Sequence, residues 1–201
     1  VTNTSAYIST SARFDSNGNR YEATDAKGNT TTTTFDSTYN AFPIQVTSPV
    51  PDPANTHGSN ASFVTTATFD TETGLPLTTT DANGLETRIE YDDVTRRPLN
   101  TKTFYNNVQV GATAETIYHD EPNNYWVKNR SQIDTNLWSE TITYFDGLGR
   151  AWKTEEVNSN GNIFVEKEFD AEGRIKRISN PFRTGETKVW TTNVYDDASR
   201  V

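Results

Sequence analysis

An aromatic–Asp dipeptide recurs along this chain and constrains its fold more than any other sequence feature. It occurs seven times, as Phe14-Asp15, Phe35-Asp36, Phe69-Asp70, Tyr91-Asp92, Phe145-Asp146, Phe169-Asp170 and Tyr195-Asp196. The steps between successive Asp residues are 21, 34, 22, 54, 24 and 26 residues. A pattern that returns at a near-constant distance is typical of proteins built from small repeated supersecondary units. The chain is therefore predicted to be a repeat array.

Two steps are longer than the others. The step of 54 residues divides into 28 and 26 if Tyr118-His119-Asp120 is a degenerate copy. The step of 34 contains the Pro-rich stretch Ser48–Pro53, which indicates an extended loop insertion over residues 45–62. With these two adjustments, residues 1–201 are interpreted as one array of about seven to eight divergent repeats, and as a fragment of a longer chain.

The residues after the dipeptide form turn motifs. Asp accepts hydrogen bonds from nearby backbone N–H groups, and Gly supplies the positive φ at which a chain reverses. Three copies read Asp, then Gly or Ser three residues later, then Arg, and Asp92 to Arg96 is a weaker copy. The predicted structural turn residues are Asp15, Asp36, Asp70, Asp92, Asp120, Asp146, Gly149, Arg150, Asp170, Gly173, Arg174, Asp196 and Arg200.

The stretches between the turns alternate apolar and polar residues with a period of two. Leu85–Tyr91 is one example, with Leu, Thr, Ile and Tyr on one side and charged residues on the other. This alternation, together with abundant Thr and 11% aromatic residues, favours antiparallel strands with one wet face. The predicted fold is all-β: tandem antiparallel β-hairpin repeats in a meander. Residues 123–139 are the least regular part of the pattern.

Composition excludes several classes of partner. The formal net charge is -9 and Lys and Arg form no cluster, which argues against nucleic acid. No apolar stretch approaches the roughly 20 residues of a membrane span. The chain contains no Cys, so disulfides and Cys-ligated metals are excluded.

The repeated Asp residues are interpreted as turn formers and not as catalytic groups. A carboxylate pair is the raw material of glycoside hydrolysis, but one active site does not need equivalent copies in every repeat. Calcium is not expected, since position 12 counted from Asp15 is Ala26 where a calcium loop needs Glu. Zinc is not expected either, because His57 and His119 are far apart. The chain is predicted to be no enzyme and to bind no cofactor or metal.

Three aromatic residues are weak candidates for ligand binding. Tyr125, Trp126 and Trp138 lie in the least repeat-like region, and exposed aromatic rings are platforms on which sugars stack. The alternative, which we favour, is that they pack on a thin sheet that has few aliphatic residues.

The repeated motif resembles the RHS or YD-repeat family. The resemblance is carried by Tyr144–Arg150 (YFDGLGR), Phe169–Ile175 (FDAEGRI) and Tyr195–Val201 (YDDASRV), with support from Phe69–Tyr91 and Phe14–Phe35. It implies β-hairpin ribbons that form a curved, spiralling sheet, part of a hollow shell. In bacterial RHS proteins and the C component of ABC-type toxin complexes, that shell encloses a toxic C-terminal region. In teneurin-like proteins, related repeats serve adhesion, and YD repeats have been linked with carbohydrate binding.

One departure from the family limits what the resemblance implies. Complete RHS proteins end in an Asp-Pro-based self-cleavage motif, whereas Asp52-Pro53 here lies in the Pro-rich insertion. The resemblance thus implies a secreted or cell-surface bacterial wall segment whose partners are neighbouring repeats and a C-terminal cargo of the same polypeptide. A glycan- or cell-surface-binding module is the alternative. As a fragment, the segment is expected to self-associate edge to edge through its unpaired first and last strands.

Overall fold

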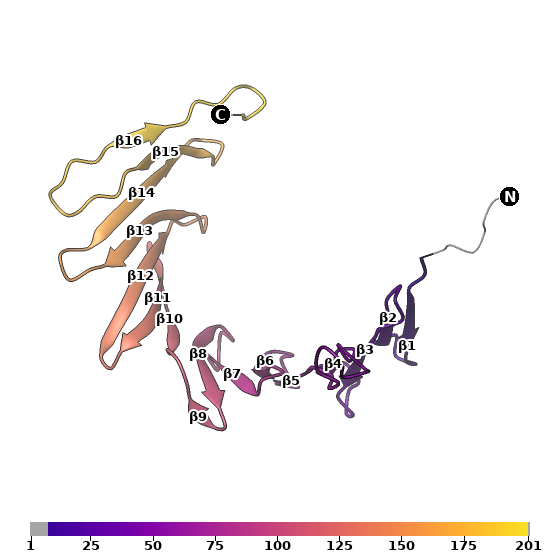
Figure 1. Ribbon diagram of the computed structural model, residues 1–201. Coiled ribbons are helices and arrows are strands. Elements are labelled where there is room, and N and C mark those ends of the chain that lie inside the picture. Colours follow the sequence, from indigo (N-terminus) through magenta and orange to yellow (C-terminus); the bar gives the residue numbers. More distant parts are fainter. Residues whose placement is uncertain (1–7, 201) are drawn as a thin grey trace. The chain divides into compact units, whose positions relative to one another are not determined.

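The computed structural model describes residues 8–200, and these residues form one antiparallel β-sheet (Figure 1). The strands are β1 (Ser11–Phe14), β2 (Arg20–Thr24), β3 (Thr30–Phe35), β4 (Pro43–Thr47), β5 (Val64–Phe69), β6 (Pro76–Thr80), β7 (Leu85–Tyr91), β8 (Pro98–Tyr105), β9 (Val108–Gln109), β10 (Ala114–Glu121), β11 (Asn124–Asp134), β12 (Leu137–Phe145), β13 (Ala151–Val157), β14 (Ile163–Phe169), β15 (Ile175–Ser179) and β16 (Trp190–Thr192).

The strand order follows the chain. Each strand pairs with the strands before and after it, except that β9 pairs only with β8, whose next neighbour on the main path is β10. Among the described residues, β1 and β16 each have one neighbour, so the sheet is not closed. The prediction of an all-β meander of tandem hairpins is confirmed.

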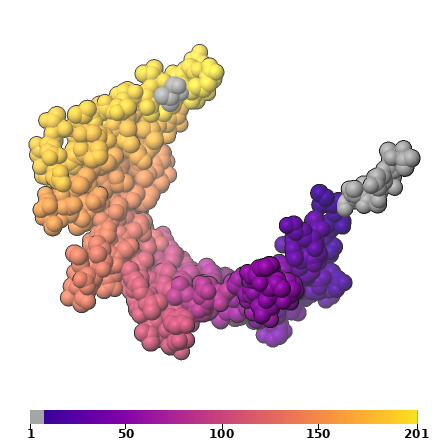
Figure 2. Space-filling view, viewed as in Figure 1, coloured from indigo at the N-terminus to yellow at the C-terminus, as the bar shows by residue number. Residues whose placement is uncertain are grey.

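The sheet comprises two compact units, which we describe separately. The first contains residues 8–90 and 102–111, and the second contains residues 91–101 and 112–200. In the space-filling view, the sequence colours follow one another in bands within each unit, as expected when repeats pack only against their chain neighbours (Figure 2).

Threonine pairs link neighbouring strands in the first unit. Thr24 and Thr30 hydroxyls lie 3.0 Å apart across β2 and β3, and Thr68 and Thr78 hydroxyls lie 2.8 Å apart across β5 and β6. Thr suits strands because its branched side chain fits the pleated surface, and cross-strand Thr pairs add hydrogen bonds.

The second unit relies on charged and aromatic cross-strand pairs. Arg130 on β11 donates through Nε to Glu115 on β10 at 2.7 Å and also contacts Glu140 on β12. Its guanidinium carbon lies 4.4 Å from the centre of the Trp138 ring. The ammonium Nζ of Lys153 lies 3.9 Å from the centre of the Tyr144 ring.

Neither unit has a conventional hydrophobic core. Phe182 is the one buried hydrophobic residue within residues 8–200, and most strand residues are half-buried or exposed. A single sheet has no second layer to cover it, so cross-strand pairs replace core packing as the source of stability.

Residues 123–139 correct the expectation of irregularity. They belong to the longest strand pair in the structure, in which β11 and β12 match from Tyr125–Phe145 to Asp134–Leu137. No aromatic–Asp turn motif occurs in this stretch, and the strand pair continues through it without a reversal until Asp134.

Candidate functional site: the aromatic–Asp turns and the cleft beside Phe145

The turn after Phe145 shows how the recurrent motif works. The Asp146 side-chain oxygen Oδ1 accepts the backbone N–H groups of Leu148 and Arg150, each at 2.9 Å. Oδ2 accepts the Arg150 guanidinium Nε at 2.7 Å. Gly149 closes the turn at φ 75°, where its N–H donates to the Asp146 carbonyl. Asp146 thus accepts the donors of the reversal with its carboxylate and its backbone carbonyl.

The copies at Asp170 and Asp196 have the same geometry. Arg174 donates through Nε to Asp170 Oδ2 at 2.7 Å, and Arg200 donates to Asp196 Oδ2 at 2.8 Å. Gly173 has φ 81°, and Ser199 takes the equivalent place at φ 58°. Asp15 uses Asn19 instead of arginine, with the amide donating to Oδ2 at 3.1 Å.

The turns at Asp36, Asp70 and Asp92 are longer versions of the same reversal. The Asp backbone N–H donates to the carbonyl of the residue four positions on in the short turns, as in Asp146 to Arg150. The acceptor is five positions on for Asp70 and Asp92, and six for Asp36. Asp70 Oδ1 accepts the N–H groups of Glu72 and Thr73.

The extra residue in the Asp92 turn changes which arginine is equivalent to Arg150. The sequence comparison matched Arg96 with Arg150, but Arg96 occupies the positive-φ place at 58° and is equivalent to Gly149. Arg97 is the equivalent of Arg150, since its carbonyl accepts the Asp92 N–H at 2.9 Å. Counting a fixed number of residues from Asp therefore missed Arg97.

The backbone donors keep these carboxyl groups ionised. The pKa of Asp146 is lowered, first by the Arg150 backbone N–H and then by the Arg150 guanidinium. The pKa of Asp36 is lowered to about 2, chiefly by the N–H groups of Phe42 and Tyr39. A carboxylate whose lone pairs are taken by donors is a poor proton carrier at neutral pH, so the geometry supports turn formation.

Several turns also contact the aromatic residue of the following repeat. We call the residue that lies opposite that aromatic residue across the strand pair the covering residue. The Arg150 guanidinium carbon lies 4.3 Å from the centre of the Phe169 ring, and that of Arg174 lies 4.4 Å from the Tyr195 ring. Arg97 lies 4.9 Å from Tyr118 in the same way. These pairs link successive repeats by cation–π contacts.

Strand register explains why the contact recurs. Continuing the β13–β14 register, in which Lys153 pairs with Glu166, places Arg150 directly opposite Phe169. In the first unit, Phe42 is the covering residue opposite Phe69, and the two rings stack with centroids 5.3 Å apart. The turn residues at this position are Asn19, Phe42, Leu75, Arg97, Arg150 and Arg174.

A β-bulge accompanies the aromatic residue in several copies. The register shifts at Phe14, Phe35, Phe69, Phe145 and Phe169. A bulge adds one residue to one strand and increases the local twist, which re-aims side chains. The constant place of the aromatic was the available sequence signal, but a single sequence does not reveal cross-strand register.

Asp120 differs from the other predicted turn residues. It lies inside β10, pairs with Tyr125, and its Oδ2 accepts the Arg97 guanidinium. Tyr118 is the true counterpart of the aromatic, since Arg97 covers it, and His119 stands where the other copies have Asp. Without that carboxylate the chain continues as a regular ladder and reverses at Pro122-Asn123, where Asn123 has φ 63°.

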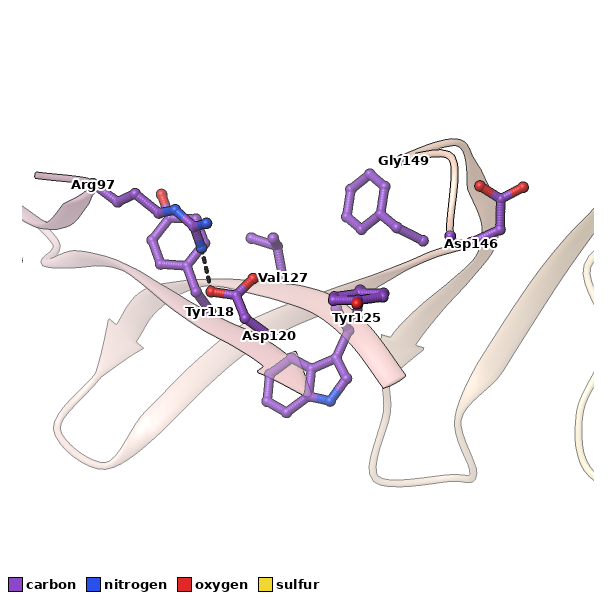
Figure 3. Close-up of a pocket in the computed structure, with 10 residues that line it drawn as sticks. Arg97, Tyr118, Asp120, Tyr125, Val127, Asp146 and Gly149 are labelled. Atoms are coloured by element: carbon purple, nitrogen blue, oxygen red, sulfur yellow. Dashed lines mark hydrogen bonds and ion pairs between the residues drawn. The ribbon is translucent and has the colours of Figure 1, made fainter. Parts of the chain in front are cut away.

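A cleft in the second unit lies beside this regular ladder, and Phe145 is among its lining residues. Figure 3 shows the cleft. Tyr125 pairs directly with Phe145, at the place where the neighbouring repeats have arginine. Direct pairing puts Tyr118, Asp120, Tyr125 and Phe145 on one face of β10–β12. The cleft has a volume of about 360 Å³, and its lining also includes Arg97, Val127 and Gly149.

The three aromatic candidates for ligand binding do not form one platform. Tyr125 lines the cleft, but Trp126 stacks on His119 with ring centroids 4.8 Å apart, although it also borders the cleft. Trp138 lies on the same face of the sheet as Trp126, and the Arg130 guanidinium covers its ring. All three are half-buried.

Residues 8–200 contain no group of three or more His, Cys, Asp and Glu side chains placed to hold a metal ion. None of these residues forms a helix long and apolar enough to cross a membrane.

Comparison with known proteins gives matches at the level of structure. No protein-family model matches the sequence, and no curated protein is significantly similar to it. The solved structure of TcdB2-TccC3 without its hypervariable C-terminal region matches 94% of the chain with a TM-score of 0.70 and 18% identity. The chain has the TcdB2-TccC3 fold over most of its length.

Two related Tc toxin structures give similar matches. TcdB2-TccC3-Cdc42 matches 94% of the chain with a TM-score of 0.67 and 17% identity. The Photorhabdus luminescens Tc holotoxin pore matches 91% with a TM-score of 0.66 and 16% identity. The chain spans only about a tenth of the length of these Tc toxin chains. The likeness concerns the fold, and it confirms the resemblance to the C component of toxin complexes at that level.

Proposed function

We propose that this chain is a non-catalytic wall segment of a large secreted or surface-exposed bacterial protein, in which a β-sheet shell encloses or presents a C-terminal cargo. The observation that carries the proposal is the match of 94% of the chain to TcdB2-TccC3. That structure lacks a hypervariable C-terminal region, which is why we infer a C-terminal cargo here as well.

The covering contacts support a mechanical role. Arg150 and Arg174 each bind the Asp of their own turn and cover the ring of the next repeat, as a wall without a second layer would require. In this proposal, residues 1–201 are one array of seven to eight repeats within a longer chain. The loop insertion expected over residues 45–62 lies between β4 and β5, and it begins after Thr47 because residues 45–47 pair with β5.

The test is protease protection of the C-terminal region in the intact protein. Digestion of the wild type should leave that region uncut, while a variant with Arg150→Ala and Arg174→Ala should expose it. Arg13→Ala is the control, because its side chain is 68% exposed and pairs with Glu22 on the adjacent strand. Equal, rapid cleavage of the C-terminal region in the wild type and the double variant would refute the enclosure proposal.

The edges of the sheet supply a second test. Unpaired edge strands present free backbone donors and acceptors that pair readily with other strands. We propose that further strands of the longer chain cover β1 and β16. The isolated segment should then self-associate with rising concentration in light scattering, and a strictly monomeric segment would contradict this.

The alternative of a carbohydrate- or cell-surface-binding module is not favoured. A sugar platform needs exposed rings on one face, whereas Trp126 is stacked on His119 and Trp138 is covered by Arg130.

A further inference from the structure

Phe145 is an exception among the rings of the second unit. Tyr118, Phe169 and Tyr195 each lie beneath an arginine guanidinium supplied by the preceding repeat. Within residues 8–200, no cationic side chain lies over Phe145, because Tyr125 occupies the covering position. The ring therefore lines the cleft.

The cleft contains the groups that hold arginine elsewhere in the unit. It has an aromatic ring, Phe145, and a second ring, Tyr125, directly across the strand. It also has a carboxylate, Asp120, whose side chain is 55% exposed. Arg97 uses Oδ2 of Asp120, and Oδ1 has no donor among the described residues. Figure 3 shows this carboxylate between Arg97 and Tyr125.

Other charges at the cleft are already compensated. Asp146 borders the cleft, but its oxygens accept the donors of its own turn and the Arg150 guanidinium. Arg97 lies between Asp120 and the Tyr118 ring. The uncompensated acceptor is thus the remaining oxygen of Asp120, in the cleft that Tyr125 and Phe145 also line.

We propose that this cleft binds one arginine side chain from an extended, basic peptide segment of a partner. The guanidinium stacks on Phe145 and Tyr125 and donates to Asp120 Oδ1, as Arg150 and Arg174 do with their own rings and carboxylates. A planar guanidinium fits this role better than an ammonium group, because it stacks on rings and donates in its plane at the same time. The net charge of -9 further favours a basic partner.

Binding is tested with the full chain and short peptides. The probe is a Gly-Arg-Gly peptide with blocked termini, followed by NMR of the Tyr and Phe ring resonances. The peptide should shift the rings of Tyr125 and Phe145 in a saturable manner. Matched peptides with lysine should bind several-fold more weakly, and peptides with citrulline, which keeps the shape and loses the charge, should not bind.

Three variants locate the site. Asp120→Asn should weaken arginine-peptide binding about tenfold, as expected for the loss of a charge-assisted hydrogen bond. Tyr125→Arg should abolish binding and raise the melting temperature, because it supplies the covering arginine from within the chain. Tyr105→Leu, at an exposed tyrosine outside the cleft, should leave binding unchanged.

Several outcomes would overturn the proposal. One is equal binding of the arginine and citrulline peptides, and another is undiminished binding by Tyr125→Arg. A third is a shift of the same rings by a maltohexaose probe with none by the arginine peptide, which would make the cleft a sugar site. Asp120→Asn keeps the test valid if a Tyr125 variant fails to fold, since the Asp120 side chain is mostly exposed.

Discussion

The guanidinium carbon of Arg150 lies 4.3 Å from the centre of the Phe169 ring, although these residues belong to successive repeats. The same guanidinium donates to Asp146 in its own turn. A single side chain therefore makes the conformation of one turn depend on the strand that follows it. Stability in such an array comes from nearest-neighbour terms of this kind.

The energy of this link can be measured with a double-mutant cycle. Arg150→Ala and Phe169→Leu should each destabilise the protein, and together they should show a coupling of about 0.5–1 kcal/mol, typical of an exposed cation–π pair. Urea unfolding of the four proteins gives the value. The same cycle with Arg13→Ala in place of Arg150→Ala should give no coupling. Additive effects in the Arg150 cycle would show that the contact contributes nothing.

Gly149 and Gly147 provide a matched pair within one turn. A Cβ at either position would meet nothing within 4 Å, but only Gly149 has a positive φ, at 75°. Gly149→Ala should cost about 1–2 kcal/mol of unfolding free energy, because an L-residue is strained in this region. Gly147→Ala should be neutral or slightly stabilising. Equal effects in thermal melts would mean that backbone strain does not control the turn.

Asp36 should make stability depend on acidity. Its pKa falls from 3.8 to about 2 in the folded protein, mainly through the backbone N–H of Phe42. A lowered folded-state pKa contributes stability that is present above about pH 4 and is lost as the pH falls through about 2. Urea midpoints should therefore drop over this range. The drop should be smaller in Asp36→Asn, which should also be less stable at neutral pH; an identical profile would contradict the assignment.

Tyr144 should resist ionisation in base. Burial, followed by its hydrogen bond to Glu155, raises the pKa of its phenol to about 12. Stability from the neutral phenol is present below about pH 10 and is lost as the pH rises through about 12. Ultraviolet titration should show a tyrosine ionising at about pH 12 that is absent from Tyr144→Phe. Glu155→Gln should move this ionisation to lower pH, and an unchanged titration would argue against the role of Glu155.

The local turns could be predicted from the sequence, because their chemistry lies within five to seven residues. Asp146, Gly149 and Arg150 are adjacent in the chain, and the hydrogen bonds that define the turn join these residues to one another. The all-β fold was predicted for a similar reason, since alternation within Leu85–Tyr91 is itself local and matches β7.

The contacts between repeats could not be predicted in the same way. That Arg150 covers Phe169 depends on cross-strand register, which the length and bulge of each turn determine. The cleft was missed for the same reason: the 28-residue step was matched through Asp120, whereas the structure matches it through Tyr118. His119 in place of Asp changes the turn type, and the two-residue reversal at Pro122-Asn123 then brings Tyr125 opposite Asp120. On the other side of β11, Tyr125 pairs with Phe145.

The strand order has a consequence for how such a protein is made. Because each strand pairs only with its neighbours along the chain, contacts form over short loops and the entropy of closing them is small. Early hairpins can acquire their hydrogen bonds while later ones are still being synthesised or exported. A gene could then gain or lose one repeat without altering the pairing of the others, which allows the length of the sheet to evolve in steps of one repeat.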